Sequence, residues 1–242
     1  MKTVYWAARL PGEINHIYLT PKLGQTLFDY IRKDNELFTE EWAKMYLSCP
    51  AASPSLKNII RVPNEIKVNF FYENNNMTVT VNDDKIKGPL KQSFIKNLLM
   101  NRSIKDKSIS LQYDIFLYCE DDLEVEQIHP WLDNTEYSKN TASVFGKFNI
   151  SKWMRPIQPT FICLSNNVTI NENDALYYLK FNTEEKIKFV EFNFTREMEN
   201  YISNNTALKF IKPYIKLSAI YDLFLKNKIN KRMLKLIKEN LV

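Results

Sequence analysis

The stretch SISLQYDIFLY, residues 108–118, decides the fold class that we expect for this chain. Every second position from residue 109 to residue 117 carries a large apolar side chain. A period of two places alternate side chains on opposite faces of an extended chain. The stretch therefore predicts a β-strand, with Leu123–Gln127 as a candidate partner strand. The side chains that it presents to a core are Ile109, Leu111, Tyr113, Ile115 and Leu117.

Several shorter segments of strand character follow, and pairs such as Asn166-Asn167 separate them as turns. Many short strands with short polar turns are typical of antiparallel sandwiches, jelly rolls and cupin-like barrels. We therefore expect at least five antiparallel strands in one sandwich or barrel across residues 108–192. The segments are Lys147–Ile150, Thr160–Leu164, Val168–Ile170, Ala175–Phe181 and Lys186–Phe192.

The flanks of this block have a different character. On the N-terminal side, residues 3–10 predict a strand, residues 23–31 and 39–49 predict helices, and residues 66–81 predict a hairpin. After Thr195 the apolar period becomes helical. We expect an α+β fold with a jelly-roll (cupin-like) centre: a β-rich main domain over residues 1–195, with an N-terminal α/β elaboration, and a basic helical segment over residues 196–242.

Charge is unevenly distributed along the chain. Residues 209–242 hold nine Lys or Arg against Asp222 and Glu239, a net charge of +7, while the whole chain carries +5. Residues 108–138 hold eight acids and no Lys or Arg. A basic helical tail suits nucleic acid as a partner, and the alternative is a solvated lysine-rich helix face. The side chains that would contact nucleic acid are Lys226, Lys228, Lys231, Arg232 and Lys235.

Several classes of function are disfavoured by composition. Four glycines form neither GxGxxG nor GxxxxGK[ST], so no phosphate-binding loop is expected. The three cysteines form no CxxC pair. No apolar run approaches the roughly 20 residues of a membrane helix. The first ten residues are too short and polar for a signal peptide, so we expect neither membrane insertion nor secretion by that route.

Histidine supply limits metal chemistry, because His16 and His129 are the only two. An iron site of two histidines and one carboxylate would need both of them, with Asp133 of the sequence HPWLD (129–133) as the carboxylate. The two histidines lie on distant segments, so we expect no metal site and no cofactor. The acids of residues 120–126 are expected to form a solvated turn between two strands.

Trp153 and Arg155 lie beside the acidic region in the expected barrel. Arg155 can pair bidentately with a carboxylate, and Trp153 can be a stacking platform or a core aromatic. We predict that Arg155 is largely buried and paired with an acid of residues 108–138, because an unpaired buried guanidinium is costly.

Four stretches resemble an uncharacterised protein family of tailed phages of marine bacteria, cyanophages in particular. They are WAARLPGEINHIYLTP (6–21), YCEDDLEVE (118–126), GKFNISKWMRPIQPTF (146–161) and ENDALYYLKFNTEEKIKF (172–189). The resemblance covers most of residues 3–195 and excludes the basic tail. The family has no assigned activity, so the resemblance implies a viral origin, in the host cytoplasm or the virion, and no catalytic residues.

Residues 168–181 also resemble, more weakly, a cupin turn, in which a strand ends in an acidic turn and re-enters as a second strand. The metal-binding histidines of cupins are absent from this stretch, which argues against cupin metal chemistry. Asp174 and Tyr178 of this stretch join His129, Asp133, Trp153 and Arg155 as the candidate binding residues.

The function that we expect is that of a non-enzymatic phage protein that binds a viral or host protein. Two alternatives stay open. One is a jelly-roll oxygenase that uses non-haem iron and 2-oxoglutarate. The other is a nucleic-acid binder that uses the basic C-terminal helices.

Overall fold

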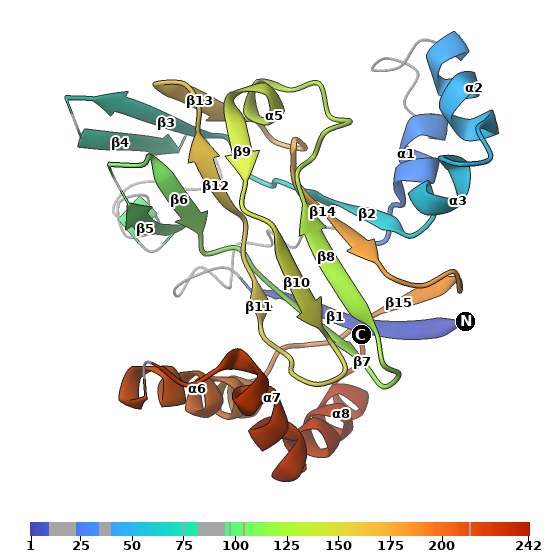
Figure 1. The fold of residues 1–242 in the computed structure, drawn as a ribbon, viewed down its shortest axis with the longest axis vertical. Helices are drawn as coiled ribbons and strands as arrows, with labels where there is room; N and C mark the ends of the chain where they lie inside the picture. The colour runs from blue at the N-terminus through green and yellow to red at the C-terminus, as the bar shows by residue number, and fades with distance from the viewer. Residues whose placement is uncertain are drawn as a thin grey trace.

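The computed structural model shows a mixed α+β chain in which mostly antiparallel sheets lie between two groups of helices (Figure 1). This confirms the α+β class expected from the sequence. The residues that the structure describes are 1–9, 23–33, 40–74, 76–81, 95–96, 98–103, 105–212 and 214–242.

Within the described residues the strands form four sheets, and β1 and β15 run parallel while the other neighbouring strands run antiparallel. Sheet A has the order β11 (Pro156–Ile157), β7 (Asp114–Cys119), β1 (Lys2–Arg9), β15 (Ile187–Glu191). Sheet B has the order β10 (Gly146–Asn149), β8 (Glu124–Ile128), β14 (Ala175–Phe181), β2 (Ile59–Pro63). Sheet C has the order β13 (Asn167–Ile170), β3 (Val68–Glu73), β4 (Asn76–Val81). Sheet D has the order β5 (Leu99–Ser103), β6 (Ser108–Leu111), β12 (Thr160–Cys163), β9 (Thr141–Ser143).

The stretch 108–118 is not one strand but two. It breaks at Gln112 and Tyr113, with β6 in sheet D and β7 in sheet A. The expected partner Leu123–Gln127 lies in β8, which pairs with β10 and β14 instead. The expected number of antiparallel strands in residues 108–192 is confirmed, and these strands are distributed over the four sheets. The hairpin expected at residues 66–81 is also confirmed, as β3 and β4.

One apolar cluster receives the inward side chains of all four sheets. In sheet A, Val4 and Trp6 of β1 point into this cluster beside Ile115 and Leu117 of β7. The intervening side chains of the same strands point to the opposite face of the sheet. Since that face is also covered, every residue of β7 is buried.

The C-terminal helices cover the outer face of sheet A (Figure 1). They are α6 (Arg196–Ile211), α7 (Leu217–Lys226) and α8 (Ile229–Glu239), and they lie in the segment expected to be helical. Phe224 of α7 and Ile237 of α8 are buried in one cluster with Tyr5 of β1 and Phe116 of β7. The tail is therefore anchored by its apolar residues, as their helical spacing indicated.

The N-terminal helices α1 (Leu27–Lys33), α2 (Glu40–Ser48) and α3 (Ser53–Leu56) lie over the outer face of sheet B. Thr26 caps α1, because its Oγ1 accepts a hydrogen bond from the Asp29 backbone nitrogen at 3.0 Å. Residue 39, where the second of these helices was expected to begin, lies outside the described residues. A further short helix, α5 (Glu136–Asn140), precedes β9. None of the helices in the described part of the chain is long and apolar enough to cross a membrane.

Candidate functional site

A buried ion pair joins sheet B to the loop that follows β8. Asp133 Oδ2 accepts hydrogen bonds from Arg61 Nη2 at 2.7 Å and from Arg61 Nε at 3.0 Å. Arg61 is 7% exposed and Asp133 is 2% exposed. Burial lowers the pKa of Arg61, but the charge and hydrogen bond of Asp133 outweigh it and leave the pKa raised. The guanidinium is therefore held charged inside the protein.

Two further donors complete the surroundings of this carboxylate. The Tyr178 hydroxyl donates to Asp133 Oδ1 at 2.5 Å, and the Ala175 backbone nitrogen donates to Oδ2 at 3.1 Å. Burial and the nearby Asp133 charge raise the pKa of Tyr178, so the phenol keeps its proton. The Tyr30 ring of α1 lies 4.7 Å from the Arg61 guanidinium carbon. The site thus connects α1, β2, β14 and the loop after β8.

Asp174 lies in the turn just before β14. Its Oδ2 accepts a hydrogen bond from the Asn171 backbone nitrogen at 2.7 Å, and burial raises its pKa. Asn173 in this turn has a φ of 67°, a left-handed conformation that asparagine tolerates. The Asn173 carbonyl oxygen accepts a hydrogen bond from Arg61. We call Arg61, Asp133, Asp174 and Tyr178 the polar node.

The polar node brings together three of the predicted site residues, Asp133, Asp174 and Tyr178, and adds Arg61, which sequence reasoning missed. The signal for Arg61 was its position in the apolar run IIRVP (59–63), where a guanidinium needs a buried partner. All four residues are buried, and both Asp133 oxygens are engaged within the protein. The node is therefore suited to positioning structural elements rather than to chemistry on a substrate.

His129 lies apart from this carboxylate. Its Nδ1 is 2.9 Å from Ser143 Oγ, and its Nε2 is 2.9 Å from the Ser138 carbonyl oxygen. Both ring nitrogens are thus engaged within the chain. The second iron ligand in the oxygenase hypothesis, His16, lies outside the described residues. Among those that are described, no group of three His, Cys, Asp or Glu residues is placed to hold a metal ion.

Arg155 is partly buried, and its predicted pairing with an acid of residues 108–138 stays a prediction. Its guanidinium carbon lies 5.1 Å from the ring centre of Phe148 and 5.3 Å from that of Trp153. Such stacking on aromatic faces favours a partly solvated guanidinium. Trp153 is buried beneath the tail helices with its ring edge-to-face against Tyr221. Arg61, which the sequence did not single out, is a buried arginine that pairs with Asp133.

The acids of residues 120–126 lie in the turn between β7 and β8 and at the start of β8. Each of the three described next contacts a different neighbour. Lys238 Nζ is 2.8 Å from Glu120 Oε1, and Lys147 Nζ is 2.8 Å from Glu124 Oε2. Asp122 accepts a hydrogen bond from Asn149 at 2.6 Å, which lowers the Asp122 pKa. The acids therefore stabilise contacts between strands and with α8 instead of converging on one cation.

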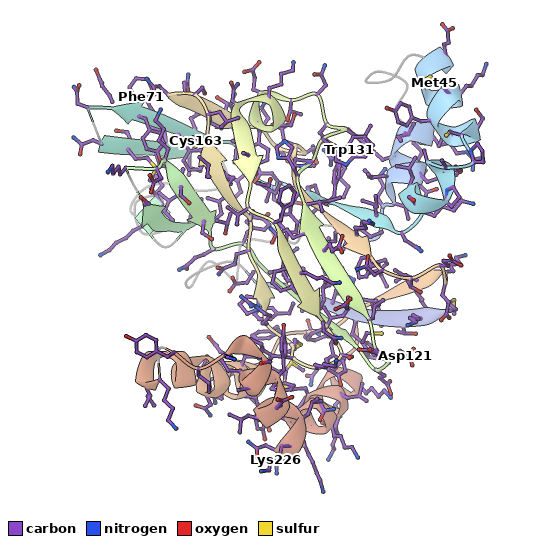
Figure 2. All side chains as sticks on the ribbon, in the orientation of Figure 1. Met45, Phe71, Asp121, Trp131, Cys163 and Lys226 are labelled. Carbon is purple, nitrogen blue, oxygen red and sulfur yellow. The ribbon has the colours of Figure 1, made fainter. Side chains whose placement is uncertain are left out.

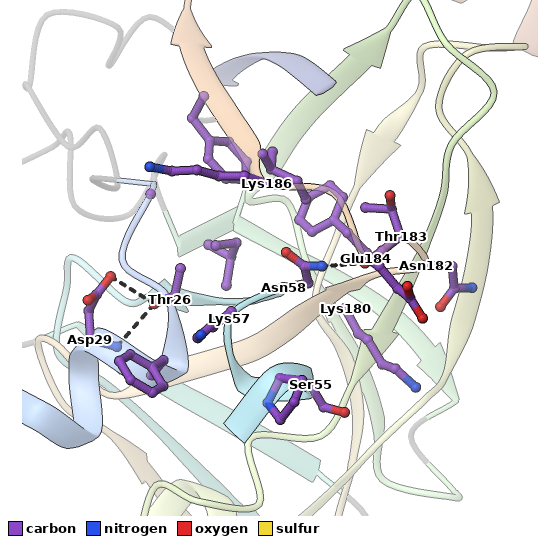
Figure 3. A pocket seen from close by; sticks show the side chains of 17 residues that line it. Thr26, Asp29, Ser55, Lys57, Asn58, Lys180, Asn182, Thr183, Glu184 and Lys186 are labelled. Atoms are coloured by element: carbon purple, nitrogen blue, oxygen red, sulfur yellow. Dashed lines mark hydrogen bonds between the residues drawn. The ribbon is translucent and has the colours of Figure 1, made fainter. Parts of the chain in front are cut away.

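An open cleft of about 1060 Å³ lies beside the polar node, between α1, α3, β2, β14 and β15 (Figure 3). Ile60, Phe181 and Phe189 supply apolar side chains to its lining. Arg61 and Tyr178 of the node are cross-strand partners in β2 and β14, the strands that also carry Ile60 and Phe181. The node therefore fixes the pairing of two strands that line the cleft, while its own side chains do not line it.

The polar side chains of the cleft differ in how they are engaged. Lys180 and Asn182 turn away from the centre (Figure 3), toward Glu126, with the Lys180 Nζ 3.8 Å from Glu126 Oε2. Lys57 Nζ lies 5.2 Å from the ring centre of Phe28. Lys186 is exposed, and no ion pair is seen for it within the described residues. Lys57 and Lys186 are thus the cations that the cleft offers to a ligand.

The sequence did not indicate this cleft, because segments from three distant parts of the chain form it. In comparisons with known proteins, no family model, no curated protein and no solved structure matches this chain.

Proposed function

We propose that this chain is a non-enzymatic protein of a bacterial virus that binds another protein, of the virus or of its host, in the host cytoplasm or in the virion. The observation that carries the proposal is the open cleft with an apolar lining and cations at its rim. Concave sites with apolar walls and a few polar groups are the usual form of binding sites. The viral origin rests on the resemblance of the four sequence stretches.

The chemistry of the cleft favours an acidic segment that carries a large apolar side chain. Phe28, Ile187 and Phe189 of the lining are partly exposed and provide apolar contact, and burying an apolar side chain of a partner contributes roughly 1.5–3 kcal/mol. Lys57 and Lys186 can each pair with a carboxylate of the partner. Small-molecule pockets measure roughly 300–1,000 Å³, so this cleft has room for several residues of a chain.

The finer architecture, a jelly-roll or cupin-like sandwich, is part of the same proposal. It is supported by sheets A and B, each of which buries one face in the shared core and the other beneath helices. The parallel pair β1 and β15 departs from the antiparallel jelly-roll pattern. A crystal structure in which the strands of sheets A and B do not trace two Greek keys would refute this architecture.

The test of the binding proposal is a quantitative pull-down from infected-cell lysate. The bait is the purified chain, and the variant is Lys57→Glu with Lys186→Glu. The matched control is Lys67→Glu with Lys188→Glu, which changes two exposed lysines outside the cleft and gives the same net charge. We expect a viral or host protein that the wild type and the control retain and that the cleft variant loses at least tenfold. Equal recovery by all three baits would overturn the proposal.

A further inference from the structure

The outward face of α8 carries a row of cations. Lys228, Lys231, Arg232 and Lys235 are all exposed and fall at positions i, i+3, i+4 and i+7. This spacing places Lys231, Arg232 and Lys235 on one side of α8, and Lys228 precedes them as the N-cap residue of the helix. Lys226, at the end of α7, is exposed beside the row and lies on the side of the tail helices away from the sheets (Figure 2).

The opposite face of α8 holds the row in place. Met233 and Ile237 are fully buried against sheet A and the other tail helices, and Ile229 packs beside them. The backbone at the end of the chain is also tied to sheet A, because the Val242 nitrogen donates to the Glu191 carbonyl oxygen at 3.1 Å. The cations are therefore presented on a fixed support and not on a free tail.

Neutralising acids lie at the C-terminal end of α8. Lys238 pairs with Glu120 at 2.8 Å, and Lys235 lies 3.8 Å from Glu239. In the part of the chain that the structure describes, no carboxylate lies within 4.0 Å of the ammonium of Lys228 or Lys231, or of the Arg232 guanidinium. The N-terminal half of α8 therefore carries uncompensated positive charge.

We infer that this face, made of Lys226, Lys228, Lys231, Arg232 and Lys235, binds nucleic acid through its phosphate backbone. A row of cations on a rigid helix matches a regular row of phosphates. A membrane-surface helix would insert its apolar face, but that face of α8 is buried on sheet A. A protein interface would offer an aromatic or aliphatic anchor, and the row contains none.

Because lysine and arginine would contact the phosphates and not the bases, we expect binding that does not depend on base sequence. Reading of bases requires side chains that reach the groove edges in a fixed, complementary pattern, whereas contacts to phosphates carry no sequence information. Asn230, the amide residue within the row, is half-buried, and its backbone carbonyl oxygen accepts a hydrogen bond from Tyr118 at 3.3 Å. The row therefore supplies phosphate contacts, which add affinity without sequence preference.

The test is fluorescence anisotropy with a labelled 30-base-pair duplex DNA of mixed sequence, between 50 and 200 mM NaCl. Five phosphate contacts, one for each cation of the face, predict a slope of log K against log salt of about −4.5, which is a loss of about 510-fold over this range. In Lys231→Gln with Lys235→Gln, the slope should change to about −2.7 and the loss to about 42-fold. The control Lys67→Gln with Lys139→Gln removes two exposed charges elsewhere and should keep the wild-type slope.

Three outcomes would overturn the inference. The first is no binding of the duplex at 50 mM NaCl. The second is an equal change of slope in the control pair, which would assign binding to net charge alone. The third is binding of phosphatidylserine vesicles without binding of the duplex, which would assign the face to membranes. Because the substituted side chains are exposed, the variants should keep the wild-type melting temperature within about 2 °C, and this is measured first.

Discussion

Two groups of helices cover the outer faces of two sheets, and the two contacts are built differently. Among the residues that the structure describes, thirteen buried apolar or aromatic residues join the C-terminal helices to sheet A. On the N-terminal side, eight described residues of this kind join the helices to sheet B, together with the ion pair of Arg61 with Asp133. The N-terminal contact also leaves the open cleft beside α1 and α3.

The tail helices are thus held on sheet A by buried apolar area. The N-terminal helices are held on sheet B partly by an ion pair with a defined hydrogen-bond geometry. Apolar burial is non-directional and scales with area, so the tail can be held by many equivalent contacts. A buried ion pair contributes little net stability but requires one arrangement of its partners. The polar node therefore suits a contact that must keep the walls of a cleft in place.

Removal of the buried carboxylate should have the largest effect on stability. Asp133→Ala leaves the Arg61 guanidinium buried without its counter-ion and removes the acceptor of Tyr178. Breaking such a pair typically costs about 3–5 kcal/mol, and we expect about 4 kcal/mol in the free energy of unfolding from urea denaturation. The control Asp121→Ala, at an exposed turn, should cost less than about 0.5 kcal/mol. Similar small losses in both variants would show that the node does not hold the N-terminal contact.

Truncation of a core aromatic in the tail should have the next largest effect. Phe224→Ala removes a fully buried side chain between the helices and sheet A and should cost about 3 kcal/mol. Ile31→Ala makes the corresponding change in the smaller N-terminal cluster, and we expect about 2 kcal/mol there. Urea denaturation measures both losses. A greater loss for Ile31→Ala would contradict the view that apolar area is concentrated under the tail.

Two tyrosines allow a matched comparison of the two contacts. Tyr178 donates to a buried carboxylate, while Tyr118 donates to the Asn230 carbonyl oxygen at 3.3 Å. Hydrogen bonds to charged groups contribute about 1.5–3 kcal/mol, and those to neutral groups about 0.5–1.5 kcal/mol. Tyr178→Phe should therefore destabilise the protein by about 2 kcal/mol and Tyr118→Phe by about 1 kcal/mol. Equal losses on chemical denaturation would mean that the carboxylate gives Tyr178 no additional role.

A further effect is confined to alkaline pH. Burial, with the nearby Glu120 charge, raises the pKa of Tyr118 from 10.0 to about 12. A raised folded-state pKa contributes stability that is present below pH 10 and is lost as the pH rises toward 12. We expect the wild type to lose more free energy of unfolding between pH 10 and pH 12 than Tyr118→Phe does. Parallel pH profiles for the two proteins would exclude Tyr118 as a source of the alkaline loss.

The sequence predicted most strands and helices because their signals are local. The segment Ala175–Phe181 was predicted with its observed bounds, since a dense apolar run with turn residues on both sides is sufficient evidence of a strand. The break in residues 108–118 was missed for a physical reason. Both β6 and β7 face the same core, so the alternation continues unbroken while the chain passes from sheet D to sheet A.

The candidate site was predicted only in part because partners are set by long-range pairing. Asp133 and Tyr178 were named, but their meeting with Arg61 depends on the register of β2 against β14. Arg155 was given the role of the buried arginine because of its neighbours in the sequence. Nothing in the sequence near Arg61 indicates that its acid lies 72 residues away.

The position of β1 in sheet A has a consequence for the order in which the chain folds. Its neighbours are β7 and β15, with Lys2 opposite Ile187 on one side and Val4 opposite Cys119 on the other. Synthesis proceeds from the N-terminus, so this early strand has no partner until β7 is made and is not enclosed until β15 is made. Such distant pairings slow folding, because a long loop must close before any contact is gained. The earliest strand of the chain is therefore among the last to reach its final place.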